Sequence, residues 1–307
     1  MSEQTEMHIF FASDNNYATP LCCAIASILR YAKQTDFHNF YILENNISKE
    51  NKEKINKLKK IKDFNIEYIT VDNKLFEKYP ITEQCKHITK ETYYRYIIPQ
   101  IKSNLEKVLY LDCDLTVVDT LADLWNTDLS DKYCGVVQDI YSLCQTEDAQ
   151  RLGLSAYFNA GVILINNKKW CKEDIGKKLF EKTIELYNSN NLIWQDQDAL
   201  NYTFKENVIW LNPRFNYQQN GLDNPCHTKY TNGEMIFAKK NPVIIHWNNA
   251  RKPWNLNCKL YANEYYKNLW ISGYYKEIFK LLRRWVFSIQ KQGDRRTLMF
   301  FGIKTKI

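Results

Sequence analysis

The feature that most constrains this chain is an apolar run at residues 108–111 that leads directly into two carboxylates, Asp112 and Asp114. Such a run is typical of a buried strand in a parallel sheet. The two aspartates then stand at its carboxyl end, on the same side of the strand, where open α/β sheets bind ligands. With no nearby Lys or Arg to pair them, they favour a divalent cation whose other ligands are water and phosphate. Because Asp-x-Asp is common, the pattern alone is equally typical of a solvated strand end.

The composition predicts one large globular α/β domain, with or without a terminal appendage. The chain has 307 residues, of which 45% are apolar and 14% aromatic, enough to build a sizeable core. It has no run of 18 apolar residues and no signal-like N-terminus, so we expect neither a membrane span nor a secretory signal. Nine irregularly spaced cysteines without a Cys-x-x-Cys pair favour reduced cytosolic thiols over disulfides or a zinc site.

The net charge of +7 is concentrated at the C-terminal end. Residues 274–307 hold nine Lys/Arg and two acidic residues, a net +7, which leaves 33 basic and 33 acidic residues in 1–273. A neutral body makes nucleic acid an improbable partner, because nucleic-acid binding relies on a basic surface.

Strands alternate with helices along most of the chain, which predicts βαβ units and a mostly parallel sheet. The predicted strands are residues 8–13, 40–43, 66–71, 108–111, 135–139, 158–166, 208–211 and 243–246. The predicted helices are residues 19–33, 48–60, 92–98, 120–125 and 171–188, and one that begins near residue 195. The first glycine is Gly135, so a glycine-rich phosphate loop of the Walker or dinucleotide type is absent. A bound nucleotide would therefore need a metal to hold its phosphates.

The C-terminal segment, residues 261–307, has the pattern of a basic amphipathic helix. Its apolar residues recur at helical spacing on one face, and these are Ile278, Leu281, Leu282, Trp285, Val286 and Ile289. The basic residues lie off that face, and they are Lys276, Lys280, Arg283, Arg284 and Lys291. This pattern suits an anionic membrane surface. A helix packed on the domain with a solvated basic face is the alternative.

Several motifs occur in an order that matches one enzyme family. They are FASDNNY at 11–17, TYYR at 92–95, LYLDCD at 109–114, YFNAGV at 157–162, QDQD at 195–198, HW at 246–247 and KPW at 252–254. With them the chain resembles the family 8 glycosyltransferases over about residues 7–260, particularly bacterial enzymes that add galactose or glucose to lipopolysaccharide. The resemblance implies a GT-A type, Rossmann-like fold that binds a UDP-sugar donor, usually with manganese.

Three residues are the implied metal ligands: Asp112, Asp114 and His246. His246 follows the apolar run 243–245 and so also stands at a strand end. Two carboxylates and one imidazole suit Mn²⁺ better than Mg²⁺, which prefers oxygen ligands, although Mg²⁺ stays possible. A lone histidine is otherwise most often a hydrogen-bonded core residue.

The resemblance also implies donor contacts. Asp14 and Asn16 would bond the uracil and ribose and Tyr17 would stack on the base, although Asx residues after a strand are also ordinary turn chemistry. Asn159 would bond a sugar hydroxyl, and the small residues after it would let a ligand approach the backbone. The remaining predicted donor contacts are Arg95, Asp112, Cys113, Asp139, Ala160, Gly161, Asn249 and Lys252.

The loop after His246 departs from the family pattern, because Asn249 stands where the family often has glycine. Since asparagine tolerates a positive φ, its backbone amide could still contact phosphate there. Lys252 would reach the diphosphate from the same loop.

Asp196 and Gln197 are the predicted catalytic pair. In the family pattern the carboxylate bonds the hexose hydroxyls and the amide lies beneath the anomeric carbon, while Asp198 is assigned a structural role. The resemblance implies retention of the anomeric configuration. Because an amide is a poor nucleophile, a front-face mechanism is favoured, with a covalent adduct on Asp196 as the alternative. Acidic residues at a helix N-terminus are also explained by the helix dipole.

The predicted function is therefore transfer of a hexose, galactose before glucose, from a UDP-sugar to a lipid-linked oligosaccharide such as lipopolysaccharide. The predicted location is the cytoplasmic face of the inner membrane, as a peripheral protein. The acceptor pocket is expected in residues 141–157 and 213–242. A nucleotidyltransferase, a glycogenin-like protein that glucosylates its own tyrosine, and a non-catalytic carbohydrate- or membrane-binding module are the alternatives.

Overall fold

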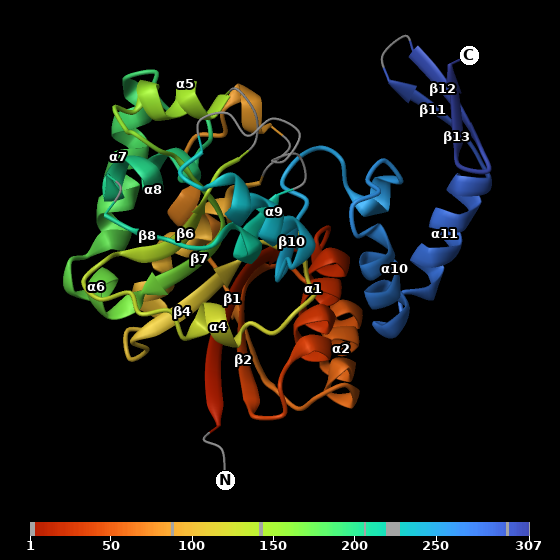
Figure 1. Cartoon of the computed structure of the whole chain (residues 1–307), viewed down its shortest axis with the longest axis horizontal. Helices are drawn as coiled ribbons and strands as arrows, with labels where there is room; N and C mark the ends of the chain where they lie inside the picture. The colour runs from red at the N-terminus through yellow and green to blue at the C-terminus, as the bar shows by residue number, and fades with distance from the viewer. Residues whose placement is uncertain are drawn as a thin grey trace.

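A seven-stranded sheet lies at the centre of the molecule, in the order β3–β2–β1–β4–β7–β6–β8 (Figure 1). The computed structural model describes residues 4–86, 89–140, 144–205, 207–218, 228–292 and 295–306. The strands of this sheet are β1 (Thr5–Asp14), β2 (Asp36–Asn45), β3 (Asn65–Thr70), β4 (Lys107–Leu111), β6 (Cys134–Gln138), β7 (Phe158–Asn166) and β8 (Ile209–Trp210). Neighbours pair in parallel except around β7, which is antiparallel to both β4 and β6. The predicted α/β fold with a mostly parallel sheet is confirmed.

This topology gathers the polar strand ends at one edge of the sheet. β1, β4 and β6 run in the same direction, so Asp14, Asp112 and Asp139 stand at neighbouring carboxyl ends. Because β7 runs the other way, its amino end, with Asn159 and Gly161, starts at that same edge. Apolar side chains on both faces of β4 and β7 are buried, which fixes the register and therefore the height of these groups.

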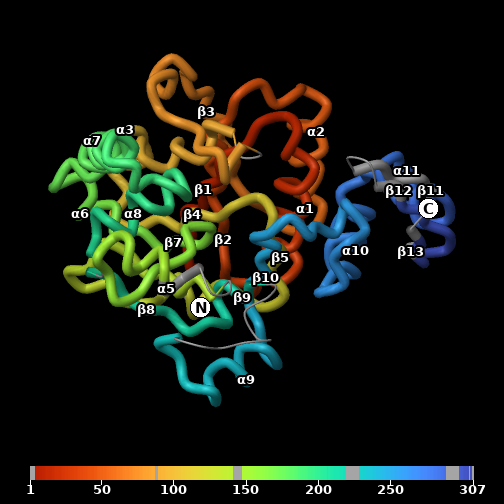
Figure 2. The backbone as a smooth tube through the Cα atoms, turned by 90° about the horizontal axis from the view of Figure 1, so that it is seen from above, coloured from red at the N-terminus to blue at the C-terminus, as the bar shows by residue number. Residues whose placement is uncertain are grey.

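Helices cover both faces of the sheet (Figure 2). One face carries α1 (Ala18–Tyr31), α2 (Lys49–Asn56), α4 (Ala122–Trp125), α9 (Asn232–Lys240), α10 (Ala262–Ile271) and the small sheet β5 (Leu115–Val117), β10 (Ile244–His246) and β9 (Tyr217–Gln218). The other carries the 3₁₀ helix η4 (Lys90–Ile97) with α3 (Ile98–Ile101), α5 (Cys144–Arg151), α6 (Asn167–Lys172), α7 (Ile175–Asn188) and α8 (Asp196–Phe204). Short 3₁₀ turns complete the chain at η1 (Lys57–Lys60), η2 (Asn73–Phe76), η3 (Glu83–Cys85), η5 (Pro213–Asn216) and η6 (Pro253–Asn255).

Two predicted helices differ from the structure for local reasons. The helix expected over residues 171–188 is broken into α6 and α7 at Asp174, whose φ of 50° is incompatible with a continuous helix. The segment expected as a helix at 92–98 is mostly the 3₁₀ helix η4. Residues 141–157 and 213–242, which had no clear pattern, contain α5, η5, β9 and α9 within their described parts.

The C-terminal segment is helical only over its first part, so the prediction of a wholly helical tail is wrong. α11 (Tyr275–Val286) is followed by a three-stranded antiparallel sheet, β11 (Phe287–Gln292), β12 (Arg295–Phe300) and β13 (Ile303–Lys306). Phe301 and Gly302 join β12 to β13 with φ values of 44° and 77°, as in the primed turns that match the twist of a hairpin. The expected apolar helix face therefore stops before Ile289, which lies in β11.

The two halves of this segment relate differently to the body. α10 packs against α1, where Arg30 lies 3.1 Å from Glu264 and donates to Asn268 at 2.7 Å. α11 and its sheet stand at the margin of the molecule beyond α10 in both views (Figures 1 and 2). Within the described residues, no helix is long and apolar enough to cross a membrane.

Candidate active site

A cavity of about 470 Å³ opens at the sheet edge where the strand ends meet. Fifteen of the predicted site residues line it: Asp14, Tyr17, Arg95, Asp112, Cys113, Asp114, Asp139, Asn159, Ala160, Gly161, Asp196, Gln197, His246, Asn249 and Lys252. Asn16 is the exception, because it is exposed at the rim and donates to the Asp14 carboxylate at 2.8 Å. Residues more than 230 positions apart in the sequence thus share one cavity.

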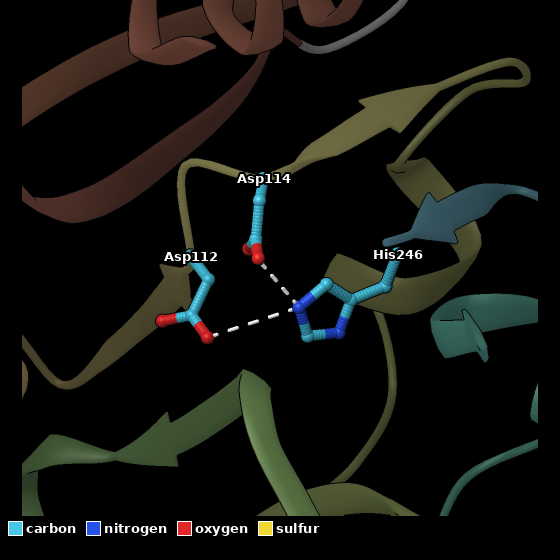
Figure 3. A group of neighbouring side chains, drawn as sticks. All are labelled: Asp112, Asp114 and His246. Atoms are coloured by element: carbon cyan, nitrogen blue, oxygen red, sulfur yellow. Dashed lines mark hydrogen bonds and ion pairs between the residues drawn. The ribbon is translucent and has the colours of Figure 1, made fainter. Parts of the chain in front are cut away.

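Asp112, Asp114 and His246 point toward one another from two elements (Figure 3). The aspartates follow β4, and His246 ends β10, where its strand pairs with Leu115 of β5. His246 Nε2 lies 3.2 Å from Asp114 Oδ1 and 3.8 Å from Asp112 Oδ2, and one ligand atom from each residue falls within 4.8 Å of the others. Two carboxylates and one imidazole nitrogen converging at this spacing can hold a divalent ion.

The environment of His246 fits a metal ligand. Its ring is buried, and its Nδ1 is 3.0 Å from Asn216 Oδ1, which leaves Nε2 directed at the two carboxylates. Metal-binding histidines are commonly held in this way, with the second ring nitrogen hydrogen-bonded to a carbonyl oxygen. His246 is thus a buried, hydrogen-bonded residue, and the two carboxylates beside its Nε2 are what distinguish it from an ordinary core histidine.

Both aspartates have cationic partners that sequence proximity did not indicate, so the expectation that no Lys or Arg would pair them is wrong. Arg95 Nη2 lies 3.1 Å from Asp112 Oδ1, and the Lys252 ammonium contacts Asp114 Oδ2. Although burial opposes ionisation, Lys252 and then His246 hold the pKa of Asp114 below its ordinary value. The carboxylate is therefore ionised and ready for a cation across the physiological pH range.

A bulge in β7 opens the sheet beneath these ligands. The pairing of β7 with β6 shifts between Val136 and Val137, so the amides of Ala160 and Gly161 leave the ladder. Gly161 also lies directly under the metal ligands: a Cβ added there would be 2.7 Å from Asp112 Oδ2 and 2.9 Å from His246 Nδ1. The small residue is therefore required by the close approach of two side chains, in addition to any approach of a ligand.

Asp196 is a buried carboxylate at the start of α8. Arg95 Nε lies 3.1 Å from its Oδ2, and the Thr92 hydroxyl donates to its Oδ1. Burial raises the pKa of Asp196 to about 6, and nearby Asp112 adds to the increase, although Arg95 and Thr92 oppose it. Arg95 therefore joins Asp112 to Asp196, and its guanidinium also lies over the Tyr110 ring.

Gln197 is held in one orientation over the cavity. Its Oε1 accepts from the Ala160 amide at 2.9 Å, and its Nε2 donates to Asp139 Oδ2 at 3.2 Å. Because the Ala160 N–H can only donate, the oxygen and nitrogen of the Gln197 amide are assigned without ambiguity. Asp139 and Gln197 therefore form one fixed polar unit at the floor of the cavity.

Asp198 is fully buried and serves the structure of this helix start. It accepts hydrogen bonds from the Ile193 and Trp194 amides at 2.6 and 2.8 Å, and from Arg151 and Tyr157 at 2.8 and 2.6 Å. Gln195, at a φ of 50°, begins the turn that these bonds hold in place. Asp198 thus shapes the segment that carries Asp196 and Gln197.

We expect Asp198→Ala to lower the free energy of unfolding by about 3–5 kcal/mol, because it removes a fully buried carboxylate and leaves the Ile193 and Trp194 amides and the Tyr157 hydroxyl without this acceptor, while Arg151 keeps Asp148. Urea unfolding followed by circular dichroism measures this loss. Asp119→Ala is the matched control, since the Asp119 side chain is 51% exposed in its 2.9 Å ion pair with Arg214, whereas Asp198 is fully buried. Exposed pairs contribute less than about 1 kcal/mol, so equal losses in the two variants would contradict the structural role.

The opposite end of the cavity carries the first strand's polar residues. Asp14 Oδ1 accepts from the Tyr17 amide at 2.9 Å. Tyr17 is 40% exposed and makes a T-shaped contact with Trp254, with ring centroids 6.2 Å apart, so part of its ring is open to the cavity. Burial, and secondarily Asp114, raise the pKa of the Tyr17 hydroxyl, which keeps it neutral.

The loop after His246 brings two more predicted residues to the cavity. Lys252 donates to the Trp247 carbonyl as well as to Asp114. Asn249 does not adopt the positive φ that a glycine-like backbone contact would require. Its Oδ1 instead accepts from the Arg251 amide at 2.7 Å.

Some cavity residues were not predicted from the sequence. Asp148 and Trp194 line the wall and are hydrogen-bonded through the indole Nε1 at 2.7 Å. Asn216, behind His246, was also missed. Trp194 directly precedes the QDQD motif, which is a usable signal, whereas nothing in the local sequence distinguishes Asp148 or Asn216 from surface residues.

These features are those of a nucleotide-sugar-dependent transferase: a GT-A type sheet with acidic strand ends, an Asp-Asp-His group that could hold a metal ion, and the Asp196–Gln197 pair in the same cavity. The family model described as glycosyl transferase family 8 matches residues 8–258. The chain belongs to this family. Its enzymes use a divalent metal and a UDP-sugar, and the chain is accordingly a hexosyltransferase.

Individual relatives agree with this assignment. The chain is similar to general stress protein A of Bacillus subtilis, with 29% identity covering 87% of this chain and 94% of that protein. It is 26% identical to a lipopolysaccharide 1,2-glucosyltransferase of Escherichia coli, covering 88% and 79%. A structure of the galactosyltransferase LgtC with donor and acceptor sugar analogs superposes with a TM-score of 0.74 at 34% identity, covering 85% and 95%.

Proposed function

We propose that this protein transfers a hexose, galactose in preference to glucose, from a UDP-sugar to the oligosaccharide of a lipopolysaccharide or lipooligosaccharide, with retention and with Mn²⁺. The observation that carries the proposal is the convergence of Asp112, Asp114 and His246 on the cavity that also holds Asp196 and Gln197. A diphosphate bound at the first group places its glycosyl bond toward the second. The similarity to the galactosyltransferase LgtC supports the donor sugar, and the similarity to a lipopolysaccharide 1,2-glucosyltransferase supports the acceptor class.

In this proposal each part of the donor has its own residues. Asp14 and Asn16 bond the uracil and ribose, and Tyr17 stacks on the base with the exposed part of its ring. Asp112, Asp114 and His246 hold the metal, which supplies Lewis-acid neutralisation of the leaving diphosphate. Lys252, Asn249 and Cys113 line the cavity beside it, and the Lys252 ammonium adds positive charge where the leaving group gains negative charge.

The hexose lies over the opposite side of the cavity. Asp196 accepts its hydroxyls, while Asp139, Asn159 and the small residues Ala160 and Gly161 line the floor. Gln197 lies beneath the anomeric carbon, and because both ends of its amide are hydrogen-bonded it is held as a dipole rather than freed as a nucleophile. An oxocarbenium-like transition state with departure and attack on one face follows, in which the leaving phosphate takes the acceptor's proton.

The test is release of UDP from UDP-galactose and UDP-glucose, with Mn²⁺ and with a chelator, in the presence of lactose as a model acceptor. We expect release that depends on the metal and is faster from UDP-galactose. Faster release from UDP-glucose would change only the proposed donor sugar, from galactose to glucose, and would leave the proposed transfer in place. A mass increase on the protein itself would support a glycogenin-like activity, and metal-dependent UDP binding without turnover on either donor would contradict the proposed transfer.

The C-terminal segment supports a membrane-associated acceptor. α11 exposes Phe279, Leu282 and Trp285 at 69, 51 and 44%, and the exposed Lys280 and Arg283 lie on the same helix. Such a surface suits the interface of an anionic bilayer, where each basic residue contributes about 1 kcal/mol. The proposal therefore locates the enzyme at the cytoplasmic face of the inner membrane, as a peripheral protein.

We expect the protein to co-sediment with phosphatidylglycerol vesicles, less at high salt and much less with phosphatidylcholine alone. Phe279→Ser combined with Leu282→Ser should lower the partition coefficient at least about tenfold, because two apolar side chains no longer enter the bilayer. Ile236→Ser with Phe237→Ser is the matched control, since these residues are comparably exposed on α9. Equal loss in both variants, or none in the first, would contradict membrane binding through α11.

A further inference from the structure

A chain of buried amides connects the backbone of β7 to His246. The Gly161 N–H donates to Asn159 Oδ1 at 3.0 Å, and Asn216 Nδ2 donates to the same oxygen at 2.9 Å. Asn216 Oδ1 then lies 3.0 Å from His246 Nδ1. Asn216 and His246 are 0 and 2% exposed, so these contacts do not compete with water.

The donor and the acceptor of each hydrogen bond in this series follow from the first one, from the Gly161 N–H to Asn159 Oδ1. A backbone N–H can only donate, so the Asn159 atom facing Gly161 is its oxygen. The Asn216 atom that faces this oxygen is then its nitrogen, because two carboxamide oxygens would repel. The oxygen of Asn216 is left for His246, which must present Nδ1–H to it. Nε2 therefore keeps its lone pair for a ligand in the position between the two aspartates.

We infer that Asn216 is a positioning residue for the metal site. It sets the tautomer and ring orientation of His246, because the hydrogen bond donated by Gly161 at the β7 bulge determines which atom of Asn216 faces the ring. This inference rests on the proposed function, because it assigns a purpose to the metal triad. The bulge is essential to it, since a Gly161 amide engaged in the β6–β7 ladder could not donate to Asn159.

Asn159 also links the metal site to the Gln197 amide. Asn159 Nδ2 lies 3.3 Å from Asp139 Oδ2 and 3.4 Å from Gln197 Oε1. Both polar atoms of Asn159 are thus used within the protein. The neighbouring Ala160 amide fixes Gln197 as the Gly161 amide fixes Asn159. Two consecutive amides of the bulge therefore orient the metal site and the hexose site together.

The test is the affinity of the protein for Mn²⁺, measured from the electron paramagnetic resonance signal of the free ion. Asn216→Leu removes both hydrogen bonds while roughly keeping the side-chain volume. We expect its dissociation constant for Mn²⁺ to rise about 10- to 100-fold, as for other residues that orient metal ligands. Asn167→Leu is the matched control, because Asn167 is equally buried and its Nδ2 makes two bonds, to Lys102 O and Leu105 O, far from the site.

Both variants should lose stability, but Asn216→Leu alone should lose Mn²⁺ affinity. A folded Asn216→Leu that binds Mn²⁺ within threefold of the wild type overturns the inference, as does an equal loss in Asn167→Leu. A second measurement needs no variant: long-range ¹H–¹⁵N correlation of His246 with Mg²⁺ and UDP should show a protonated Nδ1, and a protonated Nε2 overturns the inference. Wild-type protein that binds no divalent ion would instead refute the proposed function.

Discussion

Gly161→Ala is expected to lower the rate of metal-dependent UDP release by about a thousandfold. This factor corresponds to losing the several kcal/mol by which a Lewis-acid metal lowers the activation barrier. The added methyl group would lie 2.7 Å from Asp112 Oδ2 and 2.9 Å from His246 Nδ1, and closer still to the ring carbon Cε1 of His246. Two of the three ligands must move to admit it, and neither can move freely. Asp112 is tied to Arg95, and His246 is buried against Asn216.

The measurement is UDP release at increasing Mn²⁺ in Gly161→Ala, alongside Asp114→Ala as the reference for a lost ligand. Gly233→Ala is the matched control: the nearest heavy atom to its added Cβ is Thr231 Oγ1 at 3.9 Å, and alanine is favoured over glycine inside α9. We expect this control to keep full activity. Wild-type Mn²⁺ dependence in Gly161→Ala would show that the ligands do not occupy the positions described.

The aspartates of the site could be placed from the pattern of strand ends, although that pattern alone is not specific. His246 ends β10 of the separate three-stranded sheet and was predicted from the family resemblance, whereas the apolar run before Asp112 predicts a central strand whose carboxyl end lies at the ligand-binding edge. That reasoning uses only hydrophobic pattern and the direction of parallel strands. It therefore placed Asp112 and Asp114 at the edge of the sheet where the cavity opens.

The cationic partners could not be predicted in this way. Arg95 lies on a 3₁₀ helix and Lys252 in a loop 138 positions beyond Asp114, and both reach the aspartates only through tertiary packing. Asn216 has the same difficulty, since it sits in the turn η5, within a segment without periodicity. The partners of a buried charge depend on how helices and strands pack together. Patterns in a single sequence describe each helix or strand separately, so they do not reveal these partners.

The C-terminal hairpins were missed for a different reason. Residues 278–286 fit a helical period so well that the pattern was extended to Ile289, although the Phe-Gly pair at 301–302 is a turn signal of the kind that joins adjacent strands. The helix prediction held where the apolar face has tertiary support, at Leu281, and failed where strand pairing offered an alternative. The helix-forming tendency of a sequence is easily overridden by strand pairing in a segment that packs little against the rest of the protein.

Arg95 connects the proposed metal-binding side of the site to the proposed hexose-binding side. It bonds Asp112 on the metal side and Asp196 on the hexose side, and its Nη1 donates to the Ala160 carbonyl at the bulge. The positive charge of Arg95 is thus shared between the partly exposed Asp112 and the buried Asp196. Because both Arg95 and Asp112 influence the pKa of Asp196, Asp196 is the most informative group to titrate.

Asp196→Asn is expected to lower kcat/KM by about two to three orders of magnitude, because a buried carboxylate beside the hexose stabilises positive charge that develops in the transition state. The wild-type activity should also have an acid limb near pH 6. Burial raises the pKa of Asp196 to about 6, so the side chain is neutral below that pH and ionised above it. Activity that needs the carboxylate therefore rises as the pH increases through 6, and this limb should be absent in Asp196→Asn.

Metal ligands also protonate in acid, so the limb must be assigned with a variant that affects Asp196 alone. The Thr92 hydroxyl donates to Asp196 Oδ1 and lowers its pKa. Thr92→Val removes that bond and should move the acid limb to higher pH, at saturating Mn²⁺ and with a measurable plateau rate. A limb that stays in place in Thr92→Val, or that persists in Asp196→Asn, would assign the titration to the metal ligands and remove the ionised Asp196 from the mechanism.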